Sequence, residues 1–131
     1  MVLDASAILA VLLQEPGHEP ILNRIGEAPV VAVGVPTLVE SAIVLSSRLR
    51  RDARGLLTDF LREADAEVVP FTLDHYYVAV DAFLRYGKGR HPAALNFGDC
   101  LSYATARLSG LPLLFTGDDF SKTDIATAPP S

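Results

Sequence analysis

Short apolar runs alternate along the chain with longer stretches in which apolar residues recur every three or four positions. The runs are typical of buried strands, and the stretches are typical of helices with one buried face. Strands that are apolar throughout and alternate with helices indicate a parallel sheet with helices on both faces. We expect the strands at 1–4, 29–35, 67–71 and 111–115, with a further short strand at 124–126.

Helix-breaking residues, and apolar residues spaced three or four apart, predict where the helices lie between these strands. Pro16 and Gly17 end the first helix, and Pro36 suits the first turn of the third. From Phe97 to Leu108, apolar residues recur at spacings of four, three and four, which predicts a stripe that faces the core. The predicted helices cover 6–13, 18–26, 36–51, 54–65, 73–86 and 97–109.

The composition is typical of one folded domain. The chain has 131 residues, of which 50% are hydrophobic, so it can bury a core without disulfides. We expect a single domain over 1–126 and a short C-terminal tail at 127–131. The apolar runs are too short to span a bilayer. A single cysteine and the lack of a basic leader favour the cytoplasm.

The charge balance limits how this chain could bind nucleic acid. Eleven basic and sixteen acidic residues give a formal net charge of −5, which argues against a broad basic surface. The stretch RYGKGRHP at 85–92 is a local exception. Because carboxylates repel phosphate, a nucleic acid would have to be held by such a strip, by bound metal or by a partner.

Acidic residues stand where predicted strands end. Asp4 separates the first strand from an apolar helix, and Asp118 and Asp119 follow the strand at 111–115. Ligands of an open parallel sheet bind beyond the carboxyl ends of its strands, so these side chains converge if the two strands are neighbours. The alternative for Asp4 is an ordinary helix N-cap.

Two further acids enter helices at the same predicted end of the sheet. Glu40 has apolar neighbours one turn away and no basic partner four residues away, although the positive end of the helix dipole would also favour it there. Asp99 follows Asn96 by three residues, as in a capping box. Carboxylates brought together in this way would repel one another unless a divalent cation neutralised them.

A set of ligands made of oxygen alone is typical of Mg²⁺ or Mn²⁺. His18, His75 and His91 are scattered and form no zinc motif with Cys100, which its apolar helix favours as a small core residue. The sequence also lacks a glycine-rich phosphate loop and a motif for a catalytic nucleophile.

The stretches VLDASAIL, PTLVESAIVL, LNFGDCLSYA and LPLLFTGDDFSKTDI, in this order, resemble the PIN domain, and in particular the VapC-type toxins of bacterial toxin–antitoxin modules. The resemblance covers nearly the whole chain. It implies an α/β fold, a PIN-like doubly wound sandwich whose central parallel sheet has four or five strands with helices on both faces. It also implies a Mg²⁺- or Mn²⁺-dependent endoribonuclease that a cognate antitoxin holds inactive.

The resemblance also implies roles for the acids. Asp4, Glu40 and Asp99 occupy the family's metal-binding positions, and Asp118 matches the fourth acid. Asp119 is its rival, because GDDF is shortened relative to some relatives. In our interpretation Asp4 and Asp99 hold the principal metal, directly or through water. Glu40 and Asp118 hold coordinating water, orient the nucleophile or complete a second metal site.

Other residues could support the acids or guide the substrate. Ser6 and Thr116 match hydroxyl positions that orient carboxylates or contact phosphate, although ordinary turn and cap chemistry would also explain them. Base-specific recognition of RNA usually targets unpaired loops, so the expected substrate is loop or single-stranded RNA. The candidates for RNA contact are Arg85, Lys88, Arg90, His91 and Lys122.

The same resemblance also implies which partners the chain binds. We expect a small antitoxin whose C-terminal segment brings an Arg or Lys to the acids and buries apolar residues against the helices around 38–49 and 54–65. A homodimer is also expected, with 38–66 as its candidate surface and no membrane contact.

Two other functions remain open. One is a Mg²⁺-dependent hydrolase of a small phosphoester, although Asp4-Ala5-Ser6 lacks the second acid of a DxD motif. The other is a PIN scaffold without catalysis, which would not be expected to keep all four acids.

Overall fold

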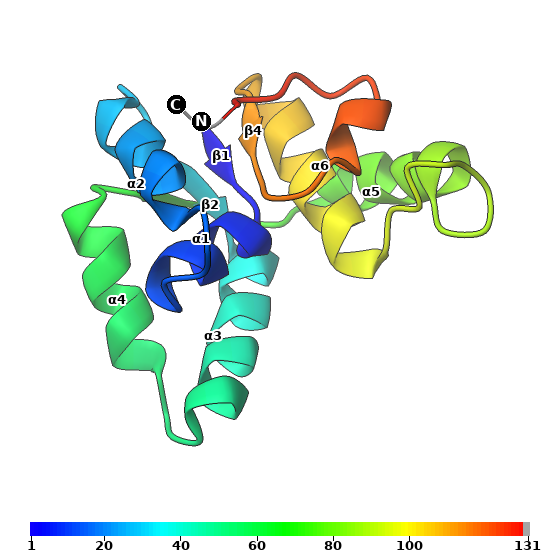
Figure 1. Cartoon of the computed structure of the whole chain (residues 1–131). Coiled ribbons are helices and arrows are strands. Elements are labelled where there is room, and N and C mark those ends of the chain that lie inside the picture. Colours follow the sequence, from blue (N-terminus) through cyan, green and yellow to red (C-terminus); the bar gives the residue numbers. More distant parts are fainter. Residues whose placement is uncertain (130–131) are drawn as a thin grey trace.

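Four short parallel strands form the centre of the fold (Figure 1). The computed structural model describes residues 1–129. The order in the sheet is β3-β2-β1-β4, and every neighbouring pair is parallel, which confirms the α/β class. The strands are β1 (Val2–Leu3), β2 (Ala32–Gly34), β3 (Glu67–Val69) and β4 (Leu113–Leu114).

All six predicted helices form, and each lies within two residues of its expected bounds. A short 3₁₀ helix follows β4 and was not expected. None of the helices in residues 1–129 is long and apolar enough to cross a membrane. The helices are α1 (Ala5–Leu12), α2 (His18–Glu27), α3 (Val35–Leu49), α4 (Arg54–Glu63), α5 (Leu73–Tyr86), α6 (Phe97–Ser109) and the 3₁₀ helix η1 (Phe120–Lys122).

The sheet separates two apolar cores, one on each face (Figure 1). Side chains of a strand point alternately to opposite faces. Leu3 therefore packs with α1, α2 and α4, whereas Val2 packs with α5 and α6. Both side chains are fully buried, which explains why the strands are apolar throughout.

The order of the strands reverses between β1 and β4. The chain runs outward from β1 through β2 to β3 and then crosses back to β4 on the other side of β1. Asp4 directly follows β1, and its backbone N–H donates to the carbonyl of Leu114 at 3.0 Å. The carboxyl ends of β1 and β4 therefore meet at the switch point where ligands of such sheets bind.

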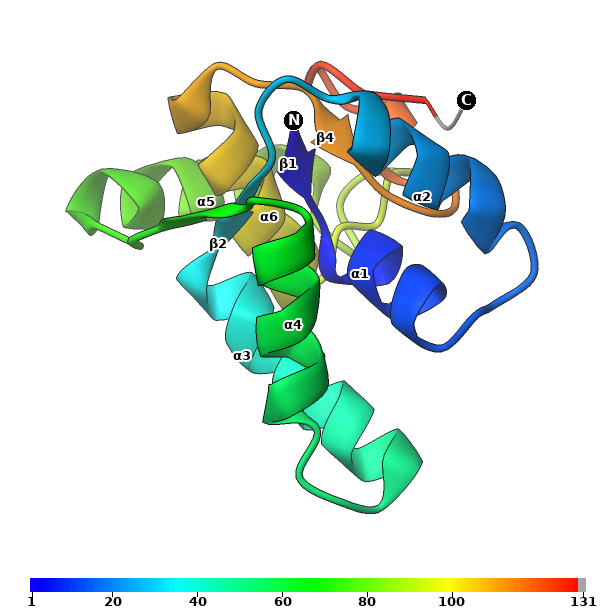
Figure 2. The ribbon, with the colours of Figure 1, turned by 90° about the vertical axis from the view of Figure 1, so that its left-hand side faces the viewer.

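Two peripheral segments differ from the body of the fold. The α3–α4 hairpin projects away from the sheet, with its turn at the far end (Figure 2). The expected strand at 124–126 does not form, and the chain instead makes a single bridge between Thr127 and Leu113. Ala128 is buried, and its N–H donates to the Leu113 carbonyl, so the start of the expected tail packs on the sheet. The tail's last residues, 130–131, lie outside the described residues.

Candidate active site

Asp4 is a buried carboxylate held by three hydrogen bonds. Its side chain is part of a residue only 5% exposed. Oδ2 accepts from the N–H of Ser6 at 3.1 Å and from the Ser6 hydroxyl at 2.6 Å, while Oδ1 accepts from the Ser102 hydroxyl at 2.6 Å. Asp4 is thus the N-cap of α1, as the alternative interpretation expected, and it also lies at the switch point. It forms no ion pair with any basic side chain of residues 1–129.

Hydroxyl groups link Asp4 to three other segments. The Ser6 hydroxyl accepts from the backbone N–H of Thr116, which ties α1 to the end of β4. Ser102 Oγ lies 3.3 Å from Thr37 Oγ1, which ties α6 to α3. Sequence reasoning missed Ser102 and Thr37. The available signal was spacing, since Ser102 lies three residues after Asp99 and therefore on the same side of α6.

Glu40 and Asp99 approach Asp4 from α3 and α6. The Glu40 carboxylate lies against Gly98, where an added Cβ would be 2.7 Å from Oε1 and 3.0 Å from Oε2. Asp99 forms the expected capping box: its N–H donates to the Asn96 side chain at 2.9 Å, and its Oδ2 accepts from the Asn96 N–H at 3.0 Å. The cap fixes the Asp99 side chain with one hydrogen bond, to Oδ2, and leaves Oδ1 without a bond from the cap.

The pKa shifts show that these carboxylates share one electrostatic environment. Burial raises the pKa of Glu40, and the charges of Asp4 and Asp99 raise it further. Burial also raises the pKa of Asp99 to about 6. The Asn96 N–H opposes that rise, and the charges of Asp4 and Asp119 add to it. Four segments of the chain thus bring negative charge to one place.

Asp118 and Asp119 are adjacent in sequence but differ in surroundings. The Asp118 side chain is 78% exposed, and its Oδ2 lies 3.8 Å from Nζ of Lys122. Asp119 is also exposed, and its charge contributes to the raised pKa of Asp99. The charge of Asp4 thus acts on Glu40 and Asp99, and that of Asp119 acts on Asp99, whereas Asp118 pairs with Lys122 at the surface.

The candidate ligand atoms are all carboxylate oxygens, which are the ligands that a hard divalent cation such as Mg²⁺ prefers. Within residues 1–129, no three acidic, histidine or cysteine side chains are close enough to ligate one ion together. Mg²⁺, however, usually keeps several waters and takes only one or two carboxylates directly. Such a cation would offset the negative charge by which Asp4 raises the pKa of Glu40 and Asp99. The arrangement thus fits a metal that is held partly through water.

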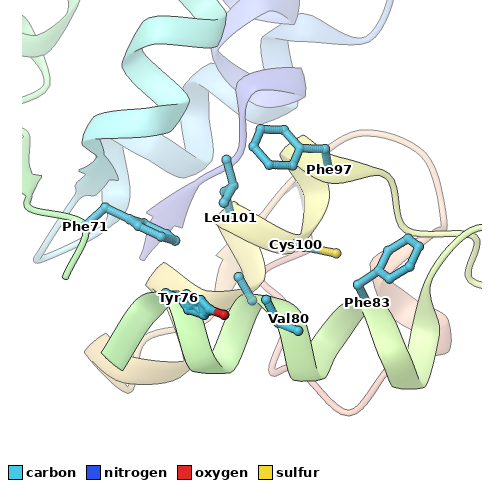
Figure 3. A pocket seen from close by; sticks show the side chains of 8 residues that line it. Phe71, Tyr76, Val80, Phe83, Phe97, Cys100 and Leu101 are labelled. Atoms are coloured by element: carbon cyan, nitrogen blue, oxygen red, sulfur yellow. The ribbon is translucent and has the colours of Figure 1, made fainter. Parts of the chain in front are cut away.

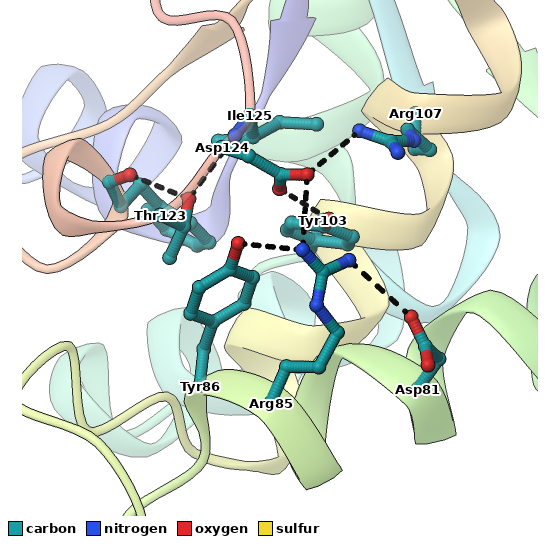
Figure 4. A network of polar contacts seen from close by, with 9 residues as sticks. Asp81, Arg85, Tyr86, Tyr103, Arg107, Thr123, Asp124 and Ile125 are labelled. Atoms are coloured by element: carbon teal, nitrogen blue, oxygen red, sulfur yellow. Dashed lines mark hydrogen bonds and ion pairs between the residues drawn. The ribbon is translucent and has the colours of Figure 1, made fainter.

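The arginine expected to contact RNA at the start of the basic loop is engaged in ion pairs (Figure 4). Arg85 lies 3.6 Å from Asp81 and 3.4 Å from Asp124. Asp124 also accepts from the Tyr103 hydroxyl at 2.6 Å and pairs with Arg107 at 3.2 Å. This network fastens the segment that follows η1 to α5 and α6.

The other basic candidates in this loop, Lys88, Arg90 and His91, form no ion pair with an acidic side chain of residues 1–129. Lys88 and Arg90 are exposed in the loop between α5 and α6, and Arg90 lies over the Phe83 ring at 5.8 Å. His91 Nδ1 accepts from the Ala93 N–H at 3.0 Å within a turn of this loop. Lys88 and Arg90 are thus the members of this loop that remain available to a phosphate.

An apolar groove leads to the acids. One pocket of about 440 Å³ lies between α5 and α6 (Figure 3), and a second of about 570 Å³ lies between α3 and α6. Phe71, Phe97 and Leu101 line both pockets, and Glu40 lines the second. Cys100 lines the first but is buried, and burial raises the pKa of its thiol to about 11, as expected of a core residue.

Comparisons with known proteins identify the family. The PIN domain model matches residues 1–126. The chain is 42% identical over 126 residues to Ribonuclease VapC of Mycolicibacterium smegmatis, a match that covers 96% of this chain and 98% of that protein. The chain belongs to the PIN domain family and, within it, to the VapC ribonucleases of toxin–antitoxin modules.

Solved structures agree with this fold. VapC20 of Mycobacterium tuberculosis, described as a toxin that cleaves the sarcin–ricin loop, has a TM-score of 0.80 at 20% identity and covers 98% of each chain. A toxin–antitoxin complex from Klebsiella pneumoniae has a TM-score of 0.73 at 17% identity, covering 99% of this chain and 97% of that chain. The PIN-like sandwich expected from the sequence is confirmed.

Proposed function

We propose that this VapC-type toxin is a Mg²⁺- or Mn²⁺-dependent endoribonuclease that hydrolyses loops of structured RNA or single strands. The observation that carries the proposal is the buried Asp4 at the β1–β4 switch point, whose charge raises the pKa of both Glu40 and Asp99. The name of VapC20, a toxin that cleaves an RNA loop, supports loop RNA as the substrate class.

The acidic residues would take different roles, according to how firmly hydrogen bonds hold each side chain. Asp4 has three hydrogen bonds and Asp99 has its capping box, so both suit fixed metal ligands. A cation bound there would activate a water and offset the charge that develops on phosphate oxygens. Glu40 would orient the attacking water from the edge of the groove.

The fourth acid of the site is proposed to be Asp119 rather than Asp118. The effect of Asp119 on the pKa of Asp99 supports this choice, as does the ion pair between Asp118 and Lys122. Ser6 and Ser102 act as positioning residues, because their hydroxyl groups hold the two oxygens of Asp4.

The experiment is cleavage of a structured RNA with single-stranded loops, with Mg²⁺ or Mn²⁺ and with EDTA. Cleavage should need the metal and should be lost in Asp99→Asn, which keeps the size and the cap of the side chain. Asp118→Asn is the matched control and should cleave like the wild type. Undiminished cleavage by a folded Asp99→Asn protein would contradict the metal site.

We further propose that an antitoxin segment lies in the apolar groove. Charge complementarity supports it, because Glu40 lines the groove and an Arg of the segment could pair bidentately with a carboxylate. Phe97, which is 80% exposed, and Ile43, which is 60% exposed, offer apolar area. As expected, α3 borders this groove, but α5 and α6 form its other wall rather than α4.

The test of the partner is co-expression with the small open reading frame beside the gene. The purified complex should cleave RNA far more slowly than the free toxin. Phe97→Asp should weaken the complex, whereas Leu73→Asp, at an exposed apolar residue outside the lining of both pockets, should not. Full activity in a stable complex would contradict inhibition at this site.

A further inference from the structure

We propose that the arginine-rich turn between α3 and α4 is an arm that binds the phosphate backbone of the RNA substrate, an inference that rests on the proposed function. Four of the chain's eleven Lys and Arg residues lie within 48–54, together with a single acid, Asp52. In a chain with a net charge of −5, this is the densest basic stretch. It lies at the projecting end of the hairpin (Figure 2).

Three of the four guanidinium groups form no ion pair within the described residues, and of these Arg51 donates a long hydrogen bond, 3.5 Å, to the Asp52 carbonyl. Arg54 pairs with Asp52 at 2.7 Å. Arg48, Arg50 and Arg51 are exposed and form no ion pair within residues 1–129. The helix dipole favours a cation in the last turn of α3, which would explain Arg48. Arg50 and Arg51 lie beyond the last residue of α3, so the dipole explains them less well.

The backbone at Arg50 is a second indication. Arg50 ends α3 in the left-handed conformation, with φ 54° and ψ 40°. Glycine adopts this conformation without strain and is the usual residue there, whereas an L side chain rarely does. Gln14, Asp65 and Ala94 also have a positive φ, so the conformation alone assigns no role, but among these residues of the described chain only Arg50 carries a positive charge.

The position of the turn fits an RNA strand that reaches the acids. Glu40, Val44 and Arg48 follow one another at intervals of four, which forms a row along α3, and Glu40 and Val44 line the same pocket. Arg50 is ten residues beyond Glu40, or about 15 Å at 1.5 Å per residue.

The arm would also explain how RNA binds close to carboxylates that repel its phosphates. The acids repel phosphate until a cation is bound, and Arg85 is engaged by Asp81 and Asp124. Arginine binds phosphate bidentately, and three guanidinium groups that form no ion pair within the described residues attract the backbone at a distance from the carboxylates. The hairpin therefore holds the strand while its scissile phosphate lies at the metal site.

The test measures binding of a fluorescein-labelled single-stranded RNA by anisotropy in EDTA, where no cleavage occurs. Arg48→Gln/Arg51→Gln should bind about 20-fold more weakly at about 0.1 M salt, and the slope of log K against log salt should become shallower by about 1.4, since each contact contributes about 0.7. The control Arg24→Gln/Arg62→Gln removes the same charge elsewhere and should change neither value.

Arg50→Gly separates the role of the side chain from that of the backbone. Glycine relieves the left-handed conformation, so the melting temperature should stay the same or rise. RNA affinity should nevertheless fall about 5-fold. With Mg²⁺ present, KM for cleavage should rise while kcat stays unchanged, because the chemistry takes place at the acids.

The failures of the two proposals are distinguishable. If wild-type protein binds RNA but never cleaves it with Mg²⁺ or Mn²⁺, the proposed function fails. If Arg48→Gln/Arg51→Gln binds RNA with wild-type affinity and salt slope, the arm is wrong while cleavage stands. If Arg48→Gln/Arg51→Gln binds RNA normally but no longer forms the antitoxin complex, the proposed arm is also wrong, and the turn binds the antitoxin instead.

Discussion

Replacing Asp99 with asparagine should stabilise the metal-free protein near neutral pH. Burial, with the charges of Asp4 and Asp119, raises the pKa of Asp99 from 3.8 to about 6 against the effect of the Asn96 N–H. Two pKa units correspond to about 3 kcal/mol. Because the side chain is partly exposed, solvent screening reduces this to about 1 kcal/mol. For a domain of this size, that is a rise in melting temperature of about 3 °C.

The substitution isolates the charge because it keeps the cap. The side-chain oxygen of asparagine can still accept from the Asn96 N–H, and the backbone N–H at position 99 still donates to Asn96. A carboxyl group whose pKa is raised in the folded state destabilises the fold only where it is ionised. The gain should therefore be absent below about pH 4, grow towards pH 6 and be complete above it.

The assay is thermal unfolding in EDTA near pH 7.5 and near pH 4. Asp118→Asn is the control, because it removes an exposed charge that is paired with Lys122, and it should not raise the melting temperature. A loss of several degrees for Asp99→Asn near neutral pH would refute the reasoning and make the side chain a structural cap. A gain that persisted near pH 4 would refute it as well.

Three further outcomes follow from other features of the chain. Gly98→Ala should lower RNA cleavage about 10-fold by displacing Glu40, since its Cβ would lie 2.7 Å from Oε1, whereas Gly55→Ala, which meets nothing within 4 Å, should not. The hydrogen bond from Tyr103 holds the pKa of Asp124 below its usual range, so Asp124→Asn should cost stability at neutral pH, and this cost should disappear as pH falls through the folded pKa. The free toxin should sediment as a dimer at micromolar concentration, and a clean monomer would contradict that expectation.

The helices were predictable because apolar residues recur over many positions. The stripe predicted to face the core on α6 is wrong, however, because Phe97 is 80% exposed and Leu108 is 45% exposed, and the buried face runs from Cys100 to Ala106 instead. The segment at 124–126 has only three residues to carry such a pattern. Ile125 is buried, but Asp124 turns to Tyr103 and two arginines instead of joining a strand. These ion pairs link residues far apart in the chain, so no local pattern could reveal them. For the same reason Arg85 looked free to contact RNA.

The positions of Asp4, Glu40 and Asp99 could be inferred because each enters a helix that starts at the carboxyl end of the sheet. Ser102 lies inside α6, where its spacing from Asp99 indicates the side of the helix but not that it will donate to a carboxylate 98 residues away. Only the packing of α6 against β1 brings Ser102 to Asp4. The acidic residues near the starts of helices could therefore be predicted from the sequence. The contacts made by side chains inside a helix could not.

The choice between Asp118 and Asp119 depends on a turn of the backbone. Gly117 has a φ of +82°, a conformation that L side chains rarely adopt, and η1 begins at Phe120. Adjacent residues in such a turn point in different directions, so one carboxylate pairs with Lys122 while the other acts on Asp99. The sequence GDD permits either arrangement. The turn that follows β4 decides which of the two acids lies within electrostatic range of Asp99 in α6.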